Sequence, residues 1–350
     1  MQTLTPEHVE AVMPGIPLEH LPHKLVDEIF NPHPIEGQFA GKDIVSITQF
    51  GKDDIERVLA VAAQEKKAAT EGAVDESLKG RTVTEFFYED STRTVISFEN
   101  AASWAGAYNS KTQGVQFSSV SKGESFPDTM RTIEALGAKA IVLRHPRMGA
   151  AAVAGAFCEV PVINGGDGPG EHPTQALLDL FTIREELGRL DELTVTMVGD
   201  LRYGRTVHSL SQLLAHYNVK LNYVSPQKLR MPKGIRLGLH AAGVEQQESR
   251  DLGDFIDETD VLYVTRVQKE RFQGKKGRKL YEAIKDDYII TPDTMERAGE
   301  HMAVMHPLPR VNEIDIRVDF DPHRRAAYFR QVSNGVPTRK ALLKLALGAV

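Results

Sequence analysis

One stretch of this 350-residue chain decides its fold: Phe87-Tyr88-Glu89-Asp90-Ser91-Thr92-Arg93-Thr94. Residues 83–88 are mostly β-branched or aromatic, which predicts a strand. After the polar cluster 91–94, apolar residues recur at helical spacing at Phe98, Ala101, Ala102 and Ala105. The cluster is therefore predicted where a strand ends and a helix begins, and a helix N-terminus readily binds phosphate.

The same cluster has an ordinary structural explanation. Serine and threonine are preferred N-caps, and an arginine in a first helical turn is often only a solvated side chain. Residues 87–94 contain no glycine, which excludes a Walker-type loop. The cluster becomes evidence for a ligand only if other anion-binding residues converge on it.

Composition excludes several classes of protein. The chain has 42 Lys and Arg against 48 Asp and Glu, a net charge of −6, which argues against broad nucleic-acid binding. Its one cysteine, Cys158, excludes an intrachain disulfide and a multi-cysteine zinc site, and fits a cytoplasmic location. No apolar run reaches the roughly 18–20 residues of a membrane span, so no membrane association is expected.

Residues 1–40 are predicted to form an N-terminal extension. They are rich in proline and acidic residues, and they lack both arginine and a continuous apolar run. These features fit neither a transit peptide nor a secretory signal. We expect the extension to pack on the main fold or project from it, where it could cap an outer edge, alter assembly or hold a partner.

Strand and helix patterns alternate along the rest of the chain. Strands are predicted at 83–88, 140–143, 160–163, 194–198, 219–224, 261–264 and 302–305, and helices at 53–70, 124–136, 174–187, 206–216 and 328–347. This alternation predicts an α/β fold of two doubly wound domains, each with a central parallel sheet flanked by helices. The domain boundary is predicted at the exit of helix 174–187. The charged residues 269–279, which include Gly274 and Gly277, are predicted to form an exposed, mobile loop.

Arginines gather at the predicted strand ends, where ligands bind in such folds. They are Arg93, Arg144, Arg205, Arg266 and Arg310. Each alone is explained as a solvated loop residue. Because arginine binds carboxylate and phosphate bidentately, the five together with Lys122 predict ligands with several negative charges. With a half-site in each domain, two anionic substrates are expected to meet in the cleft.

Two further clusters lie near predicted helix starts. The glycines of residues 165–170 would let the backbone turn closely around a ligand, and His172 and Gln175 follow, with Pro173 suited to the first helical position. A lone histidine is more often structural than catalytic, and no second ligand nearby supports a metal site. Residues 197–206 resemble a dinucleotide fingerprint but lack its glycine pattern, which excludes NAD binding.

Together these motifs resemble the catalytic chain of the aspartate carbamoyltransferases, within the aspartate/ornithine carbamoyltransferase superfamily. The resemblance covers residues 42–350 in the family's order. It rests on Ser91-Thr92-Arg93-Thr94 with Ser97-Phe98-Glu99, Ser118 with Lys122-Gly123-Glu124, Arg144-His145-Pro146, His172-Pro173-Thr174-Gln175, Asp200 with Gly204-Arg205-Thr206, Thr265-Arg266-Val267-Gln268, and His306-Pro307-Leu308-Pro309-Arg310.

The resemblance implies a role for each matching residue. Ser91, Thr92, Arg93, Thr94 and Arg144 would hold the phosphate of carbamoyl phosphate, Thr94, Arg144 and His172 its carbamoyl oxygen, and Gln175 its amino group. Arg205 would bind the α-carboxylate of aspartate, Arg266 and Gln268 its side-chain carboxylate, and the carbonyls of Pro307 and Leu308 the amino groups. Ser118 and Lys122 would reach the active site of a neighbouring subunit and contact its substrates, so a homotrimer with shared active sites is implied.

The implied domains and reaction follow from the same resemblance. Residues 41–187, with the C-terminal helix 328–350 packed back on them, would bind carbamoyl phosphate, and residues 188–327 would bind aspartate. The carbamoyl group would pass to the α-amine of aspartate without a covalent enzyme intermediate, a metal or another cofactor. The departing phosphate itself could accept the amine's proton.

Alternatives stay open at this point. Ornithine carbamoyltransferases share the phosphate loop and the His-Pro-x-Gln element, but typically carry His-Cys-Leu-Pro where this chain has residues 306–309, and a cationic acceptor would be repelled by Arg266. A catalytically silent homologue that binds a partner is the other alternative. Regulatory chains or a dihydroorotase are conceivable partners. Val95 stands where the family commonly has an arginine, and Arg202 where it frequently has a lysine.

Overall fold

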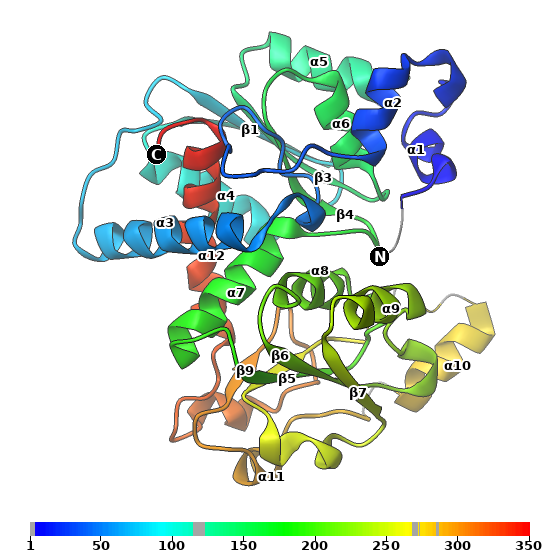
Figure 1. The fold of residues 1–350 in the computed structure, drawn as a ribbon, viewed down its shortest axis with the longest axis vertical. Helices are drawn as coiled ribbons and strands as arrows, with labels where there is room; N and C mark the ends of the chain where they lie inside the picture. The colour runs from blue at the N-terminus through cyan, green and yellow to red at the C-terminus, as the bar shows by residue number, and fades with distance from the viewer. Residues whose placement is uncertain (1–3, 115–122, 268–271, 273, 285–286) are drawn as a thin grey trace. The chain divides into compact units, whose positions relative to one another are not determined.

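The computed structural model describes residues 4–114, 123–267, 272, 274–284 and 287–350. The chain forms two compact units. Among the described residues, the first unit contains 4–178 together with Asn334–Val350, and the second unit is Asp179–Ser333. Two helices, α7 (Pro173–Leu187) and α12 (Tyr328–Ala346), therefore each contribute residues to both units (Figure 1).

The first unit is built on a four-stranded parallel sheet in the order β2-β1-β3-β4. Its strands are β1 (Thr82–Phe87), β2 (Tyr108–Gln113), β3 (Ala140–His145) and β4 (Val162–Asp167). The helices are α3 (Lys52–Thr70), α4 (Thr92–Trp104), α5 (Phe126–Ala135) and α6 (Ala150–Phe157). The central strands β1 and β3 are almost entirely buried, as expected for parallel strands rich in Val, Ile, Leu and Phe.

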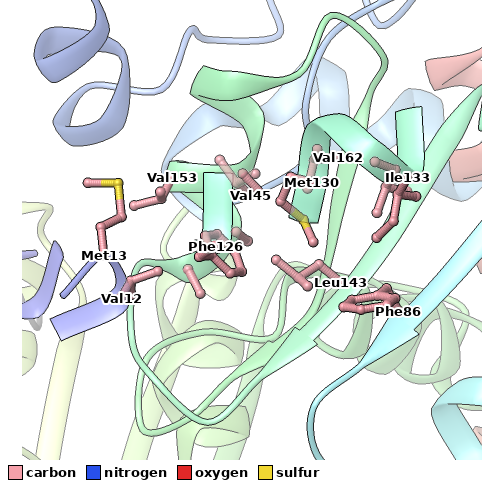
Figure 2. Close-up of a cluster of buried hydrophobic side chains, with 14 of the residues drawn as sticks. Val12, Met13, Val45, Phe86, Phe126, Met130, Ile133, Leu143, Val153 and Val162 are labelled. Atoms are coloured by element: carbon pink, nitrogen blue, oxygen red, sulfur yellow. The ribbon is translucent and has the colours of Figure 1, made fainter. Parts of the chain in front are cut away.

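The N-terminal extension packs on the first unit. Its helices α1 (Pro6–Val12) and α2 (His23–Phe30) contribute Val9, Val12 and Ile29, and Met13 after α1, to one apolar cluster with residues of α5, α6 and the sheet. Figure 2 shows Val12 and Met13 in this cluster. Val9 and Ile29 are fully buried. The extension therefore packs on the main fold and does not project from it.

The second unit is built on a five-stranded parallel sheet in the order β7-β6-β5-β8-β9. The strands are β5 (Leu193–Val198), β6 (Val219–Val224), β7 (Glu245–Ser249), β8 (Val261–Val264) and β9 (Ala303–Met305). The helices are α8 (Arg205–Leu214), α9 (Lys233–Ala241), α10 (Gly274–Ile284) and α11 (Pro292–Arg297). Short 3-10 turns occur in both units. They lie at Leu18–His20 and Ile47–Gln49 in the first unit, and at Gln227–Leu229, Leu252–Asp254, Ile256–Glu258 and Ile316–Phe320 in the second.

Two parallel sheets flanked by helices confirm the predicted fold class. Sequence patterns missed β2 and β7, which are polar strands at the sheet edges. β2 is mostly exposed, so its stability comes from pairing with β1 and not from apolar side chains of its own. Within the part of the chain that is described, no helix combines the length and the apolar character needed to cross a bilayer.

One glycine-based prediction was wrong, and a second held only for Gly168 and Gly170, which lie in the turn after β4. The described part of the predicted loop 269–279, from Gly274 onward, is the first half of helix α10. Gly277 is needed there because a Cβ atom would lie 2.7 Å from the backbone carbon of Phe272. Likewise, Gly165 and Gly166 do not form a loop but lie within β4, and the chain turns only after Asp167.

Candidate active site

The polar cluster of the first unit begins helix α4, as the sequence predicts. β1 ends at Phe87, Ser91 is the N-cap residue, and the first intrahelical bond joins the Val95 amide to the Ser91 carbonyl over 3.1 Å. The Ser91 hydroxyl makes no capping bond, so capping does not explain this serine. The amides of residues 92–94 precede that first bond and lie at the positive end of the helix dipole, where an anion is stabilised.

The side chains of this cluster differ in exposure. Thr92 and Arg93 are exposed, whereas Thr94 is buried. Val95 is also buried, so the residue that departs from the family's common pattern lies on the packed face of α4. A phosphate could therefore meet an exposed guanidinium and a buried hydroxyl within one helical turn.

Arg144 lies beside this cluster because β1 and β3 are adjacent and parallel. Phe87, the last residue of β1, pairs with Arg144 in the register of the sheet, and the Tyr88 amide donates to the Arg144 carbonyl over 2.9 Å. The Arg144 side chain is 13% exposed and donates from Nη1 to the Gly165 carbonyl over 3.0 Å. Arg93 and Arg144 thus lie at the same end of the sheet, where the carboxyl ends of β1 and β3 meet.

His172 and Gln175 lie at the start of α7, the helix that follows β4. Pro173 is its first residue, as predicted, and the His172 carbonyl accepts the amides of Gln175 and Ala176. The His172 side chain is 4% exposed, and its Nδ1 lies 3.4 Å from Thr174 Oγ1. The buried ring is therefore held by the chain around it and not by a solvated surface.

Two carboxylates that sequence reasoning missed hold the loop between β4 and α7. Asp167 accepts the amides of Gly149, over 2.8 Å, and Glu171, over 2.6 Å. Glu171 accepts from Ser46 Oγ and the Ile47 amide, and burial raises its pKa to about 7. The sequence signal for these residues is the presence of acidic side chains in a glycine-rich segment next to a buried strand. Because a buried carboxylate needs hydrogen-bond donors, such side chains are expected to bind nearby backbone amides.

In the second unit, Arg205 is the first residue of α8 and is partly buried. Asp200 shapes the preceding turn by accepting the amides of Arg202, over 3.2 Å, and Tyr203, over 3.0 Å. A Cβ atom at Gly204 would lie 2.5 Å from the Asp200 carbonyl oxygen, so this turn requires glycine. Asp200 and Gly204 thus set the position from which Arg205 starts the helix.

A pocket of about 280 Å³ opens at the carboxyl ends of β5 and β8. Arg266 lines it, together with Gly199, Thr265, Tyr281, Asn312 and Glu313. Thr265 Oγ1 donates to the Val198 carbonyl over 3.0 Å and joins the ends of the two strands. The pocket can hold a small ligand with a carboxylate facing Arg266.

Pro307 and Leu308 follow β9 and are partly buried. Leu308 has a left-handed backbone with φ of +54°, and its amide donates to His306 Nδ1 over 2.7 Å. His306 Nε2 lies 2.7 Å from Glu313 Oε1. Burial alone would raise the pKa of Glu313, but the hydrogen bonds from His306 and from the backbone amide of Val311 outweigh burial and lower it.

Arg310 departs from the predicted set of anion-binding arginines. Its guanidinium binds Asp319 through both terminal nitrogens, with the Nη2–Oδ2 contact at 2.6 Å, and donates to Tyr328 over 2.8 Å. The hydrogen bond with Asp319 raises the pKa of Arg310. Its charge is already neutralised, so Arg310 has a structural role.

Three predicted site residues, Ser118, Lys122 and Gln268, lie outside the described residues. Among the residues that are described, no three His, Cys, Asp or Glu side chains gather in a way that could hold a metal ion. The first unit brings Arg144 to the helix start 91–94, and the second unit places Arg266 in a pocket. Each unit thus places one arginine of the predicted set at the carboxyl ends of its strands.

Comparisons with known proteins identify the family. Residues 42–185 match the carbamoyl-phosphate-binding domain of the aspartate/ornithine carbamoyltransferases, and residues 191–346 match their Asp/Orn-binding domain. The chain is 47% identical over 310 residues to the aspartate carbamoyltransferase catalytic subunit of Thermococcus gammatolerans, covering 89% of this chain and 99% of that one. It is 48% identical over 314 residues to the multifunctional protein pyr1-3 of Dictyostelium discoideum, covering 90% of this chain but only 14% of that protein's length.

A solved structure agrees with this assignment. Aspartate transcarbamoylase from Trypanosoma cruzi, in complex with carbamoyl phosphate and aspartate, superposes with a TM-score of 0.83 at 39% identity, covering 90% of this chain and 99% of that one. Both halves of the chain are matched by models of the same family. The chain therefore belongs to the aspartate/ornithine carbamoyltransferase family.

Proposed function

We propose that the protein transfers the carbamoyl group of carbamoyl phosphate to the α-amine of L-aspartate, giving N-carbamoyl-L-aspartate and phosphate, an early step of de novo pyrimidine biosynthesis. The observation that carries the proposal is the pairing of β1 with β3, which sets Arg144 beside the helix start 91–94. A phosphate can be bound where a guanidinium, hydroxyls and helix amides gather at the carboxyl ends of two adjacent strands.

In this proposal the two units take different substrates. Residues 41–187, with the C-terminal helix 328–350, bind carbamoyl phosphate through Ser91, Thr92, Arg93, Thr94, Arg144, His172 and Gln175. Residues 188–327 bind aspartate through Arg205, Arg266, Gln268, Pro307 and Leu308. The family-model descriptions for residues 42–185 and 191–346 support this division except for the C-terminal helix, which the second match includes up to residue 346. The grouping of Asn334–Val350 with the first unit supports the assignment of that helix.

The acceptor is inferred from charge. Arg266 lines the pocket of the second unit, and a guanidinium attracts a side-chain carboxylate but repels the ammonium of ornithine. The names of the T. gammatolerans and T. cruzi relatives point to the same acceptor. Aspartate is therefore the proposed acceptor.

The chemistry needs only positioned donors. The aspartate amine attacks the carbamoyl carbon, a C–N bond forms, and charge develops on the carbamoyl oxygen. Thr94, Arg144 and His172 would stabilise that charge, and removing one such donor typically costs about 2.7–4 kcal/mol. The bond from carbon to the phosphate oxygen then breaks, and the departing phosphate takes the amine's proton.

Assembly and location are part of the proposal. A homotrimer in which Ser118 and Lys122 reach the neighbouring subunit's site is inferred from the family resemblance. A cytoplasmic location is inferred from the single cysteine. We also propose that this protein associates with a dihydroorotase or with regulatory chains. The name of the multifunctional relative pyr1-3 is consistent with further activities beside carbamoyl transfer.

The decisive experiment compares acceptors. Purified protein is given carbamoyl phosphate with either L-aspartate or L-ornithine, and both phosphate release and the carbamoylated product are measured. Aspartate should be the better acceptor by several orders of magnitude in kcat/KM. Preference for ornithine would replace the proposed acceptor, and no turnover with either would favour the silent homologue.

A further inference from the structure

The ring of His306 is held between the backbone of the 307–308 peptide and the carboxylate of Glu313. Nδ1 accepts the Leu308 amide over 2.7 Å, and Nε2 contacts Glu313 Oε1 over 2.7 Å. The ring is 1% exposed, so both contacts are shielded from water. The His306 ring is thus a buried link and not a surface side chain.

These partners fix the protonation of the ring. An amide N–H can only donate, so Nδ1 must be the unprotonated acceptor, and the ring proton is on Nε2, where it is donated to Glu313. Glu313 Oε2 is occupied by the amides of Val311 and Asn312, each at 3.0 Å. The carboxylate therefore presents Oε1 to the ring.

The backbone of His306 is anchored as well. Its amide donates to Gln331 Oε1 over 2.9 Å, and Gln331 Nε2 donates to Asp179 Oδ1 over 2.6 Å. Gln331 and Asp179 are both buried. Neither the ring nor the main chain of His306 can shift without breaking buried hydrogen bonds.

Holding the Leu308 amide also aims the Pro307 carbonyl. The peptide bond between Pro307 and Leu308 is planar and trans, so its C=O points opposite to its N–H. Since the N–H points at the buried His306 ring, the Pro307 carbonyl points away from it. The left-handed backbone of Leu308, unusual for a leucine, is held by the same bond.

A second histidine among the described residues accepts a backbone amide in the same way. His145 is also followed by a proline at the end of a strand, and its Nδ1 accepts the amide of Arg147, two residues on, over 3.1 Å. Burial lowers the pKa of His145 to about 4, which keeps that ring neutral. A neutral histidine before proline thus fixes the following peptide at two strand ends.

We propose that His306, oriented by Glu313, is a positioning residue that aims the Pro307 carbonyl at the amino group of the acceptor substrate. The inference rests on the proposed function, in which this carbonyl accepts an N–H of aspartate. A carbonyl fixed in direction would hold the amine so that its lone pair faces the carbamoyl carbon.

Two substitutions of His306 separate positioning from packing. His306→Asn keeps an acceptor at the δ position, where it can take the Leu308 amide as in an Asx turn. His306→Gln keeps a polar group at the ε position for Glu313 but loses the δ acceptor. If the ring only supports the core, glutamine should be tolerated at least as well as asparagine.

The readout compares aspartate with succinate, which has both carboxylates but no amine. For His306→Gln, kcat/KM for aspartate should fall by roughly tenfold or more, while the inhibition constant of succinate and KM for carbamoyl phosphate change less than about threefold. His306→Asn should stay within about threefold of the wild type. Equal losses for aspartate and succinate, or glutamine performing as well as asparagine, would overturn the inference.

Glu313→Gln provides a second variant if His306→Gln fails to fold. The amides of Val311 and Asn312 keep the new amide's oxygen at the Oε2 position, so its NH₂ group faces Nε2. The ring proton must then move to Nδ1, where it opposes the Leu308 amide. Aspartate turnover should fall while succinate inhibition is retained, and equal effects on both would again contradict the inference. If the wild type turns over no aspartate, the proposed function itself is overturned. If the wild type is active but the variants affect aspartate and succinate equally, only the role of His306 is overturned.

Discussion

Tyr263, on β8, donates its hydroxyl proton to Oδ2 of Asp179, on α7, over 2.7 Å, and both side chains are fully buried. Burial, together with the Asp179 carboxylate, raises the pKa of Tyr263, so the hydroxyl stays a donor. Gln331 occupies the other oxygen of Asp179. One carboxylate thus joins the central sheet of the second unit to the two helices that contribute residues to both units.

Replacing Asp179 should therefore destabilise the protein. Asp179→Ala leaves the Tyr263 hydroxyl and the Gln331 amide without this acceptor, at about 1–3 kcal/mol for each buried donor. We expect the free energy of unfolding, measured in urea, to fall by about 2–5 kcal/mol. Asp257→Ala is the control, because Asp257 is 71% exposed and its pair with Arg297 should be worth less than about 1 kcal/mol. Equal losses for the two variants would refute the role of Asp179.

Arg93→Ala tests the phosphate-binding role of the helix start. Loss of an exposed guanidinium beside the α4 amides should lower kcat/KM for carbamoyl phosphate by roughly 10²–10³ without a change in the melting temperature. Arg57→Ala, an equally exposed arginine on α3, is the control and should leave turnover unchanged. Unaltered turnover in Arg93→Ala would remove Arg93 from the site.

Shared active sites predict complementation between two inactive variants. Lys122→Ala and Arg93→Ala chains are unfolded, mixed in equal amounts and refolded. If each site combines Arg93 of one chain with Lys122 of its neighbour, activity should recover to at most about a quarter of the wild-type value, because random assembly makes that fraction of sites intact. Each variant refolded alone should stay inactive. No recovery in the mixture would argue for sites built from one chain.

Glu85 predicts a pH dependence of stability. The side chain is fully buried on β1, and neither carboxyl oxygen has a hydrogen-bond partner among the described residues. Burial, reinforced by Glu99 and only partly offset by Lys111, raises the pKa of Glu85 to about 8. Because this pKa exceeds the ordinary glutamate value of 4.5, the folded state holds an extra proton between these two pH values, and stability is lost as pH rises through that window.

Glu85→Gln isolates this effect, since glutamine does not ionise. The variant should gain stability over the wild type as pH rises from about 4.5 to 8, with a slope of at most about 1.4 kcal/mol per pH unit. Denaturation in urea at a series of pH values measures the difference. A difference that does not change with pH would show that Glu85 ionises normally.

The extension should contribute to the stability of the first unit. Ile29→Ala removes a fully buried side chain from the cluster that α1 and α2 form with α6, and typical losses for such substitutions are about 2–5 kcal/mol. Val74→Ala, at a side chain that is 90% exposed, should change stability by less than about 0.5 kcal/mol.

Deleting the extension tests its function separately from its packing. If assembly and activity persist without residues 1–40, none of the three roles considered for the extension (an edge cap, an assembly element or a partner site) holds. If activity persists while only stability falls, the extension acts through the apolar contacts of Val9, Val12 and Ile29 alone.

Local sequence determined those features that depend on neighbouring residues. The strand and the helix on either side of Ser91–Thr94 are encoded by β-branched and aromatic residues and by helical periodicity, and both signals lie within about twenty positions. The start of α7 at Pro173 and of α8 at Arg205 follows from similar short-range signals. The α/β class followed from the alternation of such segments.

Only the tertiary structure decided which distant groups meet. Arg144, at the end of the buried strand β3, and Arg310, in the segment after the buried strand β9, look alike in sequence, yet Arg144 lies beside the β1 end while Arg310 is neutralised by Asp319. The link from Glu313 through His306 to Leu308 likewise has no local pattern, because it depends on how a turn folds back on a buried ring. Backbone preferences act over a few residues, whereas the pairing of charges is set by packing between elements far apart in the chain.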